Sequence, residues 1–433
     1  MQDTLWNTIY ITVCDMLERE KMDYLEMMRQ QPEDKEALVI NGESYTYKEL
    51  VSMAEEFGRT LPQTYKKKIY IIREKTILRQ LISFIGCMGT GWIPLIVPYD
   101  SKESIAQLAK SIEIPQKAIM AVATSGSTGV PKILFRSYES WAGFFDEQNK
   151  IFGITEKSRL FAHGSLAFTG NLNLYMAQFY AGATMVAEDD FAPQQWAERI
   201  VSENVNAIYL IPVKLLLLPR VINKSCGQVR TILAGSQSLG RQDAQSLKTV
   251  FPNVRIVLYY GASELNYITY VTDEAMTGKR NLIGRPFPGV SVEIKDGEIF
   301  VDTPWHVEGI DMPFSLKDMG YMDESGNFYF EGRSDDIVNI RGRKVSLLKI
   351  QNRLEQLDEV QEASVVYTGK SDTGIEAFVV LKEPAAGVDG RRLSEKLRET
   401  LAHFEMPRKI VIVYEIPKNE SGKIIKNNRQ IQK

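Results

Sequence analysis

The chain has 433 residues, of which 44% are hydrophobic and 25% are charged, and its formal net charge is −3. This composition is that of an ordinary globular protein, and the length allows two or more domains with their own cores. Because basic and acidic residues almost balance, neither nucleic acid nor an anionic membrane is expected as the main partner. No apolar run approaches the roughly 18 residues of a membrane span, so no integral membrane association is expected.

Cysteine and histidine are rare and scattered. Cys14, Cys87 and Cys226 form no CxxC pair, so they fit neither a disulfide framework nor a zinc site. The three histidines lie far apart in the sequence, which disfavours a multi-histidine metal centre. The N-terminus carries acidic residues early and lacks the basic start of a secretory signal. These features predict a cytoplasmic protein.

The first predicted elements alternate between helices and strands. Residues 46–61 are expected to form an amphipathic helix, which Thr46 and Glu49 begin with a capping box. Short buried strands are expected at 67–74 and 91–100, with a helix between them. The alternation then continues with strands at 183–188, 207–212, 230–235 and 255–261 and helices at 193–204 and 240–251. Strands separated by helices of this length predict a wound α/β sheet.

The pattern changes after Gly284. Residues 290–304 and 321–333 contain short strands with Asp-Gly and Ser-Gly-Asn turns, which predict hairpins. Beyond a charged stretch at 331–342, helices are expected at 345–357 and 394–404, and strands at 363–368, 376–383 and 409–417. We therefore predict an α/β protein with two domains, residues 1–334 and residues 335–433. The first combines wound α/β sheets with a β-rich subdomain, and the second is a small α+β unit.

A loop rich in Gly, Ser and Thr, within the sequence AVATSGSTGVPKILFRS, joins two apolar strands at 118–123 and 133–135. It is not a P-loop, because Lys132 does not directly follow a glycine. Its backbone N–H groups, its hydroxyls and Lys132 together suit the oxygens of phosphate groups. Taken by itself, the loop could also be a mobile surface turn.

The loop resembles the phosphate-binding signature of the adenylate-forming superfamily, which contains acyl- and aryl-CoA synthetases, adenylation domains of peptide synthetases, and luciferases. Further motifs of this family follow in its order. They are YYGASE (259–264), GRPFPG (from 284), LKDMGYMDESGNFYFEGRSDD (316–336), NIRGRKVS (339–346) and PKNESGKIIK (417–426). The ordered motifs cover roughly residues 40 to 430, and on them the chain is identified as a member.

The resemblance implies a reaction in two halves. A carboxylate attacks the α-phosphate of ATP and forms an acyl-adenylate and pyrophosphate, and a thiol then displaces AMP. The implied cofactors are ATP and Mg²⁺. The implied partners are a small carboxylic acid and either CoA or a phosphopantetheinylated carrier protein.

The resemblance also implies which residues bind ATP. Glu264 would hold Mg²⁺, a hard cation that prefers oxygen ligands, and Ser263 would reach the α-phosphate. Tyr260 would stack on adenine, although it could also be plain core. The residues implied in holding the β- and γ-phosphates or flanking the base are Thr124, Ser125, Gly126, Ser127, Thr128, Gly129, Lys132, Gly235 and Ser236.

Asp318 and Arg333 would contact the ribose hydroxyls, the alternatives being a turn residue and a surface ion pair. Lys423 would be the catalytic lysine of the first half-reaction, or else a solvated lysine in a basic tail. The small C-terminal domain is mobile in the family, with Asp335 at the hinge position. Its rotation would bring Gly342 to the thiol tunnel, unless Gly342 is only a turn glycine.

The acyl site is expected along residues 161–173, with His163 at the aromatic gate position and Phe168 nearby. His163 could instead be an ordinary core histidine. Gly261 would leave the pocket floor open. Residues 162–178 contain no Asp to pair with an ammonium, which disfavours an α-amino acid. A fatty or aryl acid is therefore predicted.

One residue departs from the family pattern, and two alternative functions remain open. Lys317 replaces the glycine that the family usually has before its ribose-binding aspartate. The adenylation could end in an amide or another product that is not a thioester, as in luciferase-like enzymes. The chain could also be a catalytically silent nucleotide-binding homologue, although Lys132, Glu264 and Lys423 are intact.

Overall fold

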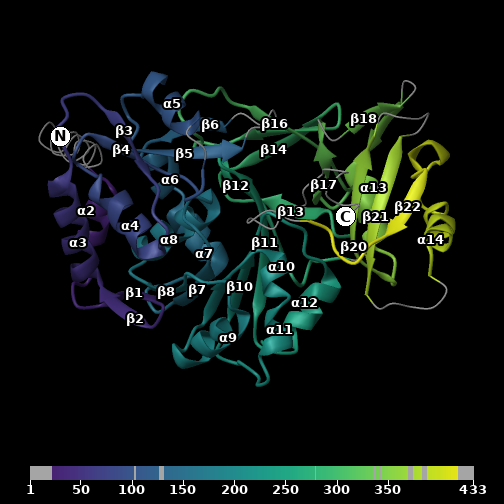
Figure 1. Cartoon of the computed structure of the whole chain (residues 1–433), viewed down its shortest axis with the longest axis horizontal. Coiled ribbons are helices and arrows are strands. Elements are labelled where there is room, and N and C mark those ends of the chain that lie inside the picture. The colour runs from purple at the N-terminus through teal and green to yellow at the C-terminus, as the bar shows by residue number, and fades with distance from the viewer. Residues whose placement is uncertain are drawn as a thin grey trace, which may run out of the picture.

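The computed structural model describes residues 22–101, 104–125, 131–277, 279–334, 337–340, 343–368, 374–382 and 388–417. It confirms the predicted mixed α/β architecture with large sheets and a smaller C-terminal part. The N-terminal elements lie at one end of the molecule, and strands β20–β22 with helix α14 lie at the other (Figure 1). Among the described residues, no helix is long and apolar enough to cross a membrane.

The largest sheet combines a parallel centre with antiparallel flanks. Strands β8, β7, β9, β10 and β11 run parallel, as the alternating pattern predicted. Strands β14 to β17 form the antiparallel hairpins expected after Gly284, and β12 pairs antiparallel with β11. In sheet order the strands are β14 (Ser291–Lys295), β15 (Glu298–Asp302), β16 (Phe314–Met322), β17 (Phe328–Arg333), β13 (Leu282–Pro286), β12 (Asn266–Thr272), β11 (Arg255–Ala262), β10 (Thr231–Ala234), β9 (Ala207–Tyr209), β7 (Arg159–His163), β8 (Thr184–Glu188), β1 (Glu36–Ile40) and β2 (Glu43–Thr46).

A second sheet carries the Gly- and Ser-rich loop. Strands β3 (Lys68–Ile72), β4 (Trp92–Ile96) and β5 (Met120–Ser125) are parallel, and β6 (Pro131–Arg136) pairs antiparallel with β5. The loop therefore joins the two strands of a hairpin, as the flanking apolar runs predicted.

Helices cover the sheets, and α3 begins at the predicted capping box. Thr46 and Glu49 form the expected capping box: the Glu49 N–H donates to Thr46 Oγ1 at 3.2 Å, and the Thr46 N–H donates to Glu49 Oε2 at 2.7 Å. The helices of this part are α2 (Tyr24–Arg29), α3 (Tyr47–Thr60), α4 (Ile77–Gly86), α5 (Ser104–Ser111), α6 (Glu139–Ala142), α7 (Phe145–Phe152), α8 (Thr169–Tyr180), α9 (Pro193–Ser202), α10 (Pro212–Leu215), α11 (Leu218–Val221) and α12 (Arg241–Lys248).

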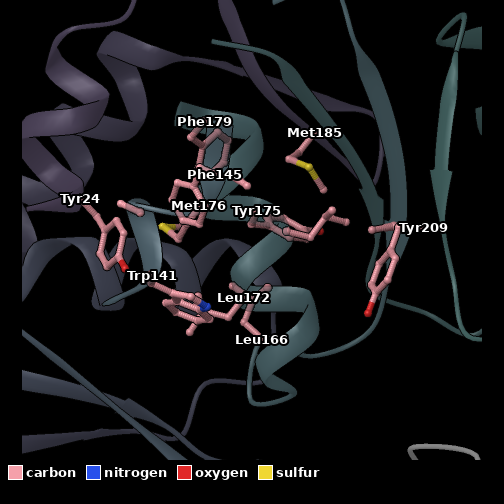
Figure 2. Close-up of a cluster of buried hydrophobic side chains, with 14 of the residues drawn as sticks. Tyr24, Trp141, Phe145, Leu166, Leu172, Tyr175, Met176, Phe179, Met185 and Tyr209 are labelled. Atoms are coloured by element: carbon pink, nitrogen blue, oxygen red, sulfur yellow. The ribbon is translucent and has the colours of Figure 1, made fainter. Parts of the chain in front are cut away.

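Helix α8 is buried almost all round. Residues 171–179 are all buried, which is expected for a helix whose sides are all largely apolar. Figure 2 shows Leu172, Tyr175, Met176 and Phe179 of α8 among other buried side chains of the same cluster. Because the helix is enclosed, its N-terminal turn is held firmly in place.

The C-terminal part has a core of its own. Strands β20 (Val360–Tyr367), β21 (Ile375–Leu381) and β22 (Lys409–Ile412) form a sheet, preceded by the hairpin of β18 (Ile337–Ile340) and β19 (Arg343–Ser346). Helices α13 (Leu347–Glu355) and α14 (Gly390–Leu397) pack with it, and a short 3₁₀ helix, η2, spans His403–Glu405. The helix predicted at 394–404 therefore begins and ends earlier. The domain boundary between residues 334 and 335 remains a prediction.

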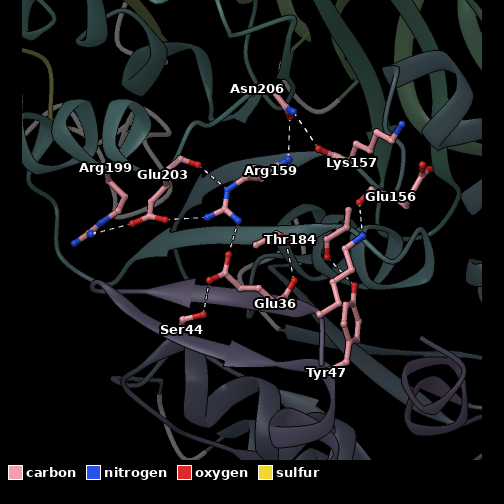
Figure 3. A network of polar contacts seen from close by, with 12 residues as sticks. Glu36, Ser44, Tyr47, Glu156, Lys157, Arg159, Thr184, Arg199, Glu203 and Asn206 are labelled. Carbon is pink, nitrogen blue, oxygen red and sulfur yellow. Dashed lines mark hydrogen bonds and ion pairs between the residues drawn. The ribbon is translucent and has the colours of Figure 1, made fainter. Parts of the chain in front are cut away.

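A network of polar side chains ties the edge of the large sheet to α9. The Arg159 guanidinium donates to the backbone oxygen of Glu203 at 2.6 Å and to its carboxylate at 2.8 Å. It also donates to the carboxylate of Glu36 on β1 (Figure 3). The side chains of Arg159, Glu36 and Glu203 are 26%, 30% and 23% exposed, so these charges are only partly solvated.

We predict that Arg159→Leu lowers the free energy of unfolding by about 2 kcal/mol, because it leaves the half-buried carboxylate of Glu36 without its cation and leaves Glu203 with Arg199 alone. The measurement is urea denaturation followed by circular dichroism. Lys48→Ala is the matched control, because its ion pair with Glu33 is 61% and 68% exposed. Such a pair contributes less than about 0.5 kcal/mol. Equal losses in the two variants would contradict the prediction.

Candidate active site

The phosphate-loop hairpin places Lys132 opposite Thr124. These two residues are register partners on β6 and β5, and the Lys132 side chain is exposed. Gly126, Ser127, Thr128 and Gly129 lie outside the described residues, and so does the Ser125 side chain. The described hairpin therefore brings one cation to the base of the predicted phosphate loop.

Three residues from separate motifs meet beside the end of β11. The Tyr260 hydroxyl donates to Asp318 Oδ2 in a short hydrogen bond. Arg333 is the register partner of Asp318, and its Nε lies 3.4 Å from Asp318 Oδ1. The Tyr260 ring also lies against Phe330, with 6.0 Å between the ring centroids. The structure thus brings together residues that the motifs assigned to adenine and ribose.

The Asp318 carboxylate is only 4% exposed, and its Oδ1 accepts no hydrogen bond from any described residue. Burial raises the pKa of Asp318, against the lowering effects of Tyr260 and Arg333. Burial also raises the pKa of Tyr260 well above its usual value, so the phenol stays a donor. A buried carboxylate oxygen with spare acceptor capacity suits a ligand that presents hydroxyl groups.

Ser263 and Glu264 lie in a turn that is fixed from several sides. Ser263 Oγ donates to Thr169 Oγ1 at 2.9 Å, at the first residue of α8. The Val307 N–H donates to the Glu264 carbonyl oxygen at 2.9 Å. The Glu264 carboxylate is half-buried, and as an oxygen ligand on a fixed backbone it fits a Mg²⁺ ion.

Arg136 contributes to this turn, and the sequence analysis missed it. Its fully buried guanidinium donates to the carbonyl oxygens of Ser263 at 2.7 Å, Ser140 at 2.9 Å and Trp305 at 3.3 Å. Burial lowers the pKa of Arg136 to about 10, so the side chain keeps its charge at neutral pH. The available signal was an arginine directly after the apolar run of a buried strand.

Two glycines of the predicted site are explained by close packing. A Cβ on Gly235 would lie 2.3 Å from Cζ of Tyr259, so the tyrosine ring rests directly on this glycine. A Cβ on Gly261 would lie 2.4 Å from the carbonyl oxygen of Asn266. Gly261 therefore allows β11 and β12 to approach each other, and its role in an open pocket floor stays a prediction. Ser236, next to Gly235, has a φ of +67°.

His163 is held by Trp196 and Lys214. Its ring centroid lies 4.4 Å from that of Trp196, and its Nδ1 lies 2.8 Å from Lys214 Nζ. Burial, followed by the charge of Lys214, lowers the pKa of His163 to about 3, so the imidazole is neutral. Phe168 caps the N-terminus of α8, next to Thr169. Lys214 was not singled out from the sequence.

Some of the remaining predicted residues lie outside the part of the chain that the structure describes. Asp335, Gly342 and Lys423 lie outside the described residues. Lys317, which stands where the family usually has glycine, has a φ of +64°. Its ammonium lies 2.9 Å from the Glu298 carboxylate. The backbone therefore keeps a left-handed conformation there although the residue is a lysine.

Comparison with known proteins identifies two matching families. The family of AMP-binding enzymes matches residues 106–309, and the family of their C-terminal domain matches residues 349–423. An uncharacterized acyl–CoA ligase of Bacillus subtilis is 27% identical over 345 residues, covering 76% of this chain and 71% of the relative. A 2-succinylbenzoate–CoA ligase of Lactococcus lactis is 24% identical over 332 residues, covering 73% of this chain and 72% of the relative.

Among solved structures, o-succinylbenzoate coenzyme A synthetase from Bacillus subtilis, in complex with ATP and magnesium ion, has the same fold. Its TM-score is 0.79 at 20% sequence identity, and the match covers 95% of this chain and 99% of that one.

We predict that Lys317→Gly raises the free energy of unfolding by about 0.5–1 kcal/mol, because glycine adopts a positive φ without strain. The loss of the largely exposed pair with Glu298 offsets only a small part of this gain. Lys317→Ala is the control: it loses the same pair but keeps the strained φ, so its stability should be unchanged or lower. Chemical denaturation of both variants tests this, and equal effects would contradict it.

Proposed function

The chain belongs to the AMP-binding enzymes of the adenylate-forming superfamily, and from this premise we propose how it works. It is an ATP-dependent acid–thiol ligase. It activates a carboxylic acid as acyl-AMP with release of pyrophosphate, and it then transfers the acyl group to the thiol of CoA. ATP and Mg²⁺ are its cofactors.

The observation that carries the nucleotide assignment is the meeting of Tyr260, Asp318 and Arg333. In our proposal, Asp318 accepts hydrogen bonds from the ribose hydroxyls through Oδ1, which has acceptor capacity beyond its ion pair with Arg333, and Arg333 contacts the same sugar. The Tyr260 ring lies against adenine while its hydroxyl keeps Asp318 in place. Gly235 and Ser236 flank the base.

The first half-reaction brings an anionic nucleophile to an anionic phosphate, so catalysis depends mainly on positioning and charge neutralisation. The loop from Thr124 to Gly129 with Lys132 holds the β- and γ-phosphates. Ser263 orients the α-phosphate, supported by its contact with Thr169. Glu264 holds Mg²⁺, which offsets phosphate charge when bound. Lys423 neutralises charge on the reacting oxygens from the C-terminal domain.

The second half-reaction needs the C-terminal domain to move. We place the domains at 1–334 and 335–433, with Asp335 as the hinge and Gly342 at the thiol tunnel. The family matches support this division, because they end at residue 309 and resume at residue 349. Hinges occupy positions where a few residues can absorb a change of φ and ψ.

The acid is a fatty or aryl acid that lies against Phe168 and the first turn of α8. A carrier protein with a phosphopantetheine arm is a possible acceptor besides CoA, since both present the same thiol. We place the enzyme in the cytoplasm, because its three cysteines suit a reducing compartment. Formation of an amide from the acyl-adenylate is the second candidate, and product analysis distinguishes it.

We predict that Lys423→Ala slows acid-dependent ATP–pyrophosphate exchange about 10²–10³-fold, because a charge that stabilises the transition state is lost. The rate of acyl transfer from supplied acyl-AMP to the thiol should change little. Lys426→Ala is the control, because it removes a neighbouring lysine outside the proposed catalytic position. Exchange at the wild-type rate in Lys423→Ala would refute the assignment.

We predict that Asp318→Asn raises the KM for ATP about 10–100-fold, the effect of losing hydrogen bonds to a charged acceptor. ATP binding favours the ionised carboxylate, so acidification through the raised pKa of Asp318 should weaken binding by the wild type. This dependence should be absent in Asp318→Asn, which also controls for protonation of ATP itself. Calorimetry at acidic and neutral pH checks both points, and identical pH profiles would contradict the role of Asp318.

A further inference from the structure

Lys214 is a half-buried cation that has no acidic partner among the described residues. It lies on α10, and its ammonium contacts His163 Nδ1 at 2.8 Å. Among the described residues it forms no ion pair, and burial alone lowers its pKa to about 8. It therefore carries its charge at neutral pH in a place where charge is costly. Charges that are largely removed from water are usually paired in proteins, so the ammonium of Lys214 would stabilise an anion bound beside it.

His163 fixes the direction of the lysine side chain. Its neutral ring packs on Trp196, and Phe191 lies beside it at 6.0 Å between centroids. A neutral imidazole accepts at one nitrogen, and here Nδ1 accepts from Lys214. One N–H of the ammonium is thus used by His163, and the others remain available to a ligand.

The ammonium lies near the proposed acyl site. A Cβ placed on Gly164, the neighbour of His163, would lie 3.7 Å from Lys214 Nζ and 2.9 Å from Asn171 Nδ2. Asn171 belongs to the same first turn of α8 as Thr169, which contacts Ser263. A single helical turn therefore separates Lys214 from the hydroxyl proposed to meet the α-phosphate.

Two tyrosines limit the space on the other side of this turn. A Cβ on Gly170 would lie 2.8 Å from Tyr209 Oη and 3.1 Å from Tyr259 Oη. The two buried hydroxyls bond to each other at 2.7 Å, and the Tyr259 ring covers Gly235. These contacts pack two buried tyrosine hydroxyls directly against the first turn of α8.

We propose that Lys214 binds a second carboxylate on the acid, so that the substrate is a short dicarboxylic acid. Its reacting carboxylate lies near Ser263, and its far carboxylate pairs with Lys214. The span across one helical turn is on the order of 10 Å with side chains, which suits an acid of about four to six carbon atoms. This inference rests on the proposed ligase activity, and it replaces the fatty or aryl acid of that proposal with a diacid.

The same ammonium could meet an anionic group of the thiol acceptor, so the experiment separates the two sources. ATP–pyrophosphate exchange is measured without thiol, with succinate, glutarate and adipate against butyrate, pentanoate and hexanoate. The wild type should prefer a diacid over the monoacid of equal length at least about 10-fold in kcat/KM. In Lys214→Met, the kcat/KM for the diacid should fall about 10–100-fold, and the kcat/KM for the monoacid should change less than about 3-fold.

Two further variants make the test specific. Lys214→Arg keeps the charge and should retain most of the diacid preference. Lys224→Met removes an exposed lysine from the segment after α11 and should leave both acids unaffected. Lys214→Met should keep the wild-type melting temperature, because it replaces an unpaired half-buried charge by an apolar chain of similar length.

Four outcomes would overturn the inference. An unchanged diacid-to-monoacid ratio in Lys214→Met is the first. The second is a loss confined to the thiol step, which would assign the anion to the acceptor. If the wild type catalyses no exchange with any acid, including fatty and aryl acids, the proposed function itself fails and the inference falls with it. Exchange with fatty or aryl monoacids alone leaves the proposed function intact and rejects only the diacid.

Discussion

The buried Arg136 guanidinium holds the candidate site together. It lies on the hairpin strand that begins beside the phosphate loop, and it donates to the backbone of Ser263 and of Trp305. Three segments distant in sequence therefore share one cation. A fully buried charge is tolerated only where enough acceptors surround it, and here three carbonyl oxygens supply them. The position of Ser263 and Glu264 relative to Lys132 depends on this arrangement.

Local secondary structure could largely be predicted from the sequence. The capping box at Thr46, the strands on both sides of the phosphate loop and the hairpins after Gly284 follow from short-range rules, and the structure has them. Such features depend on residues that lie within a few positions of one another. The order of the motifs similarly predicted that Tyr260, Asp318 and Arg333 belong to one site, and these three residues do meet.

The features that could not be predicted from the sequence depend on contacts between distant segments. Arg136 and Lys214 have no motif, and their partners lie 127 and 51 positions away. Gly261 is a related case, because a glycine gives no sign of which neighbour requires its missing Cβ. In the structure, the carbonyl oxygen of Asn266 lies where that Cβ would be. A bulge between Tyr260 and Gly261 accompanies this close approach.

The enclosed helix α8 connects these observations. Because its sides are buried, its first turn cannot shift without disturbing the core, so it is a fixed reference for anything bound beside it. Thr169 on that turn meets Ser263, and Asn171 lies beside Gly164 and Lys214. If Ser263 meets the α-phosphate as we propose, a rigid turn between its hydroxyl and the ammonium of Lys214 sets a distance, and a distance selects ligands by length. The acid is then recognised at both of its ends, and the binding energy at Lys214 helps to hold the reacting carboxylate against the α-phosphate.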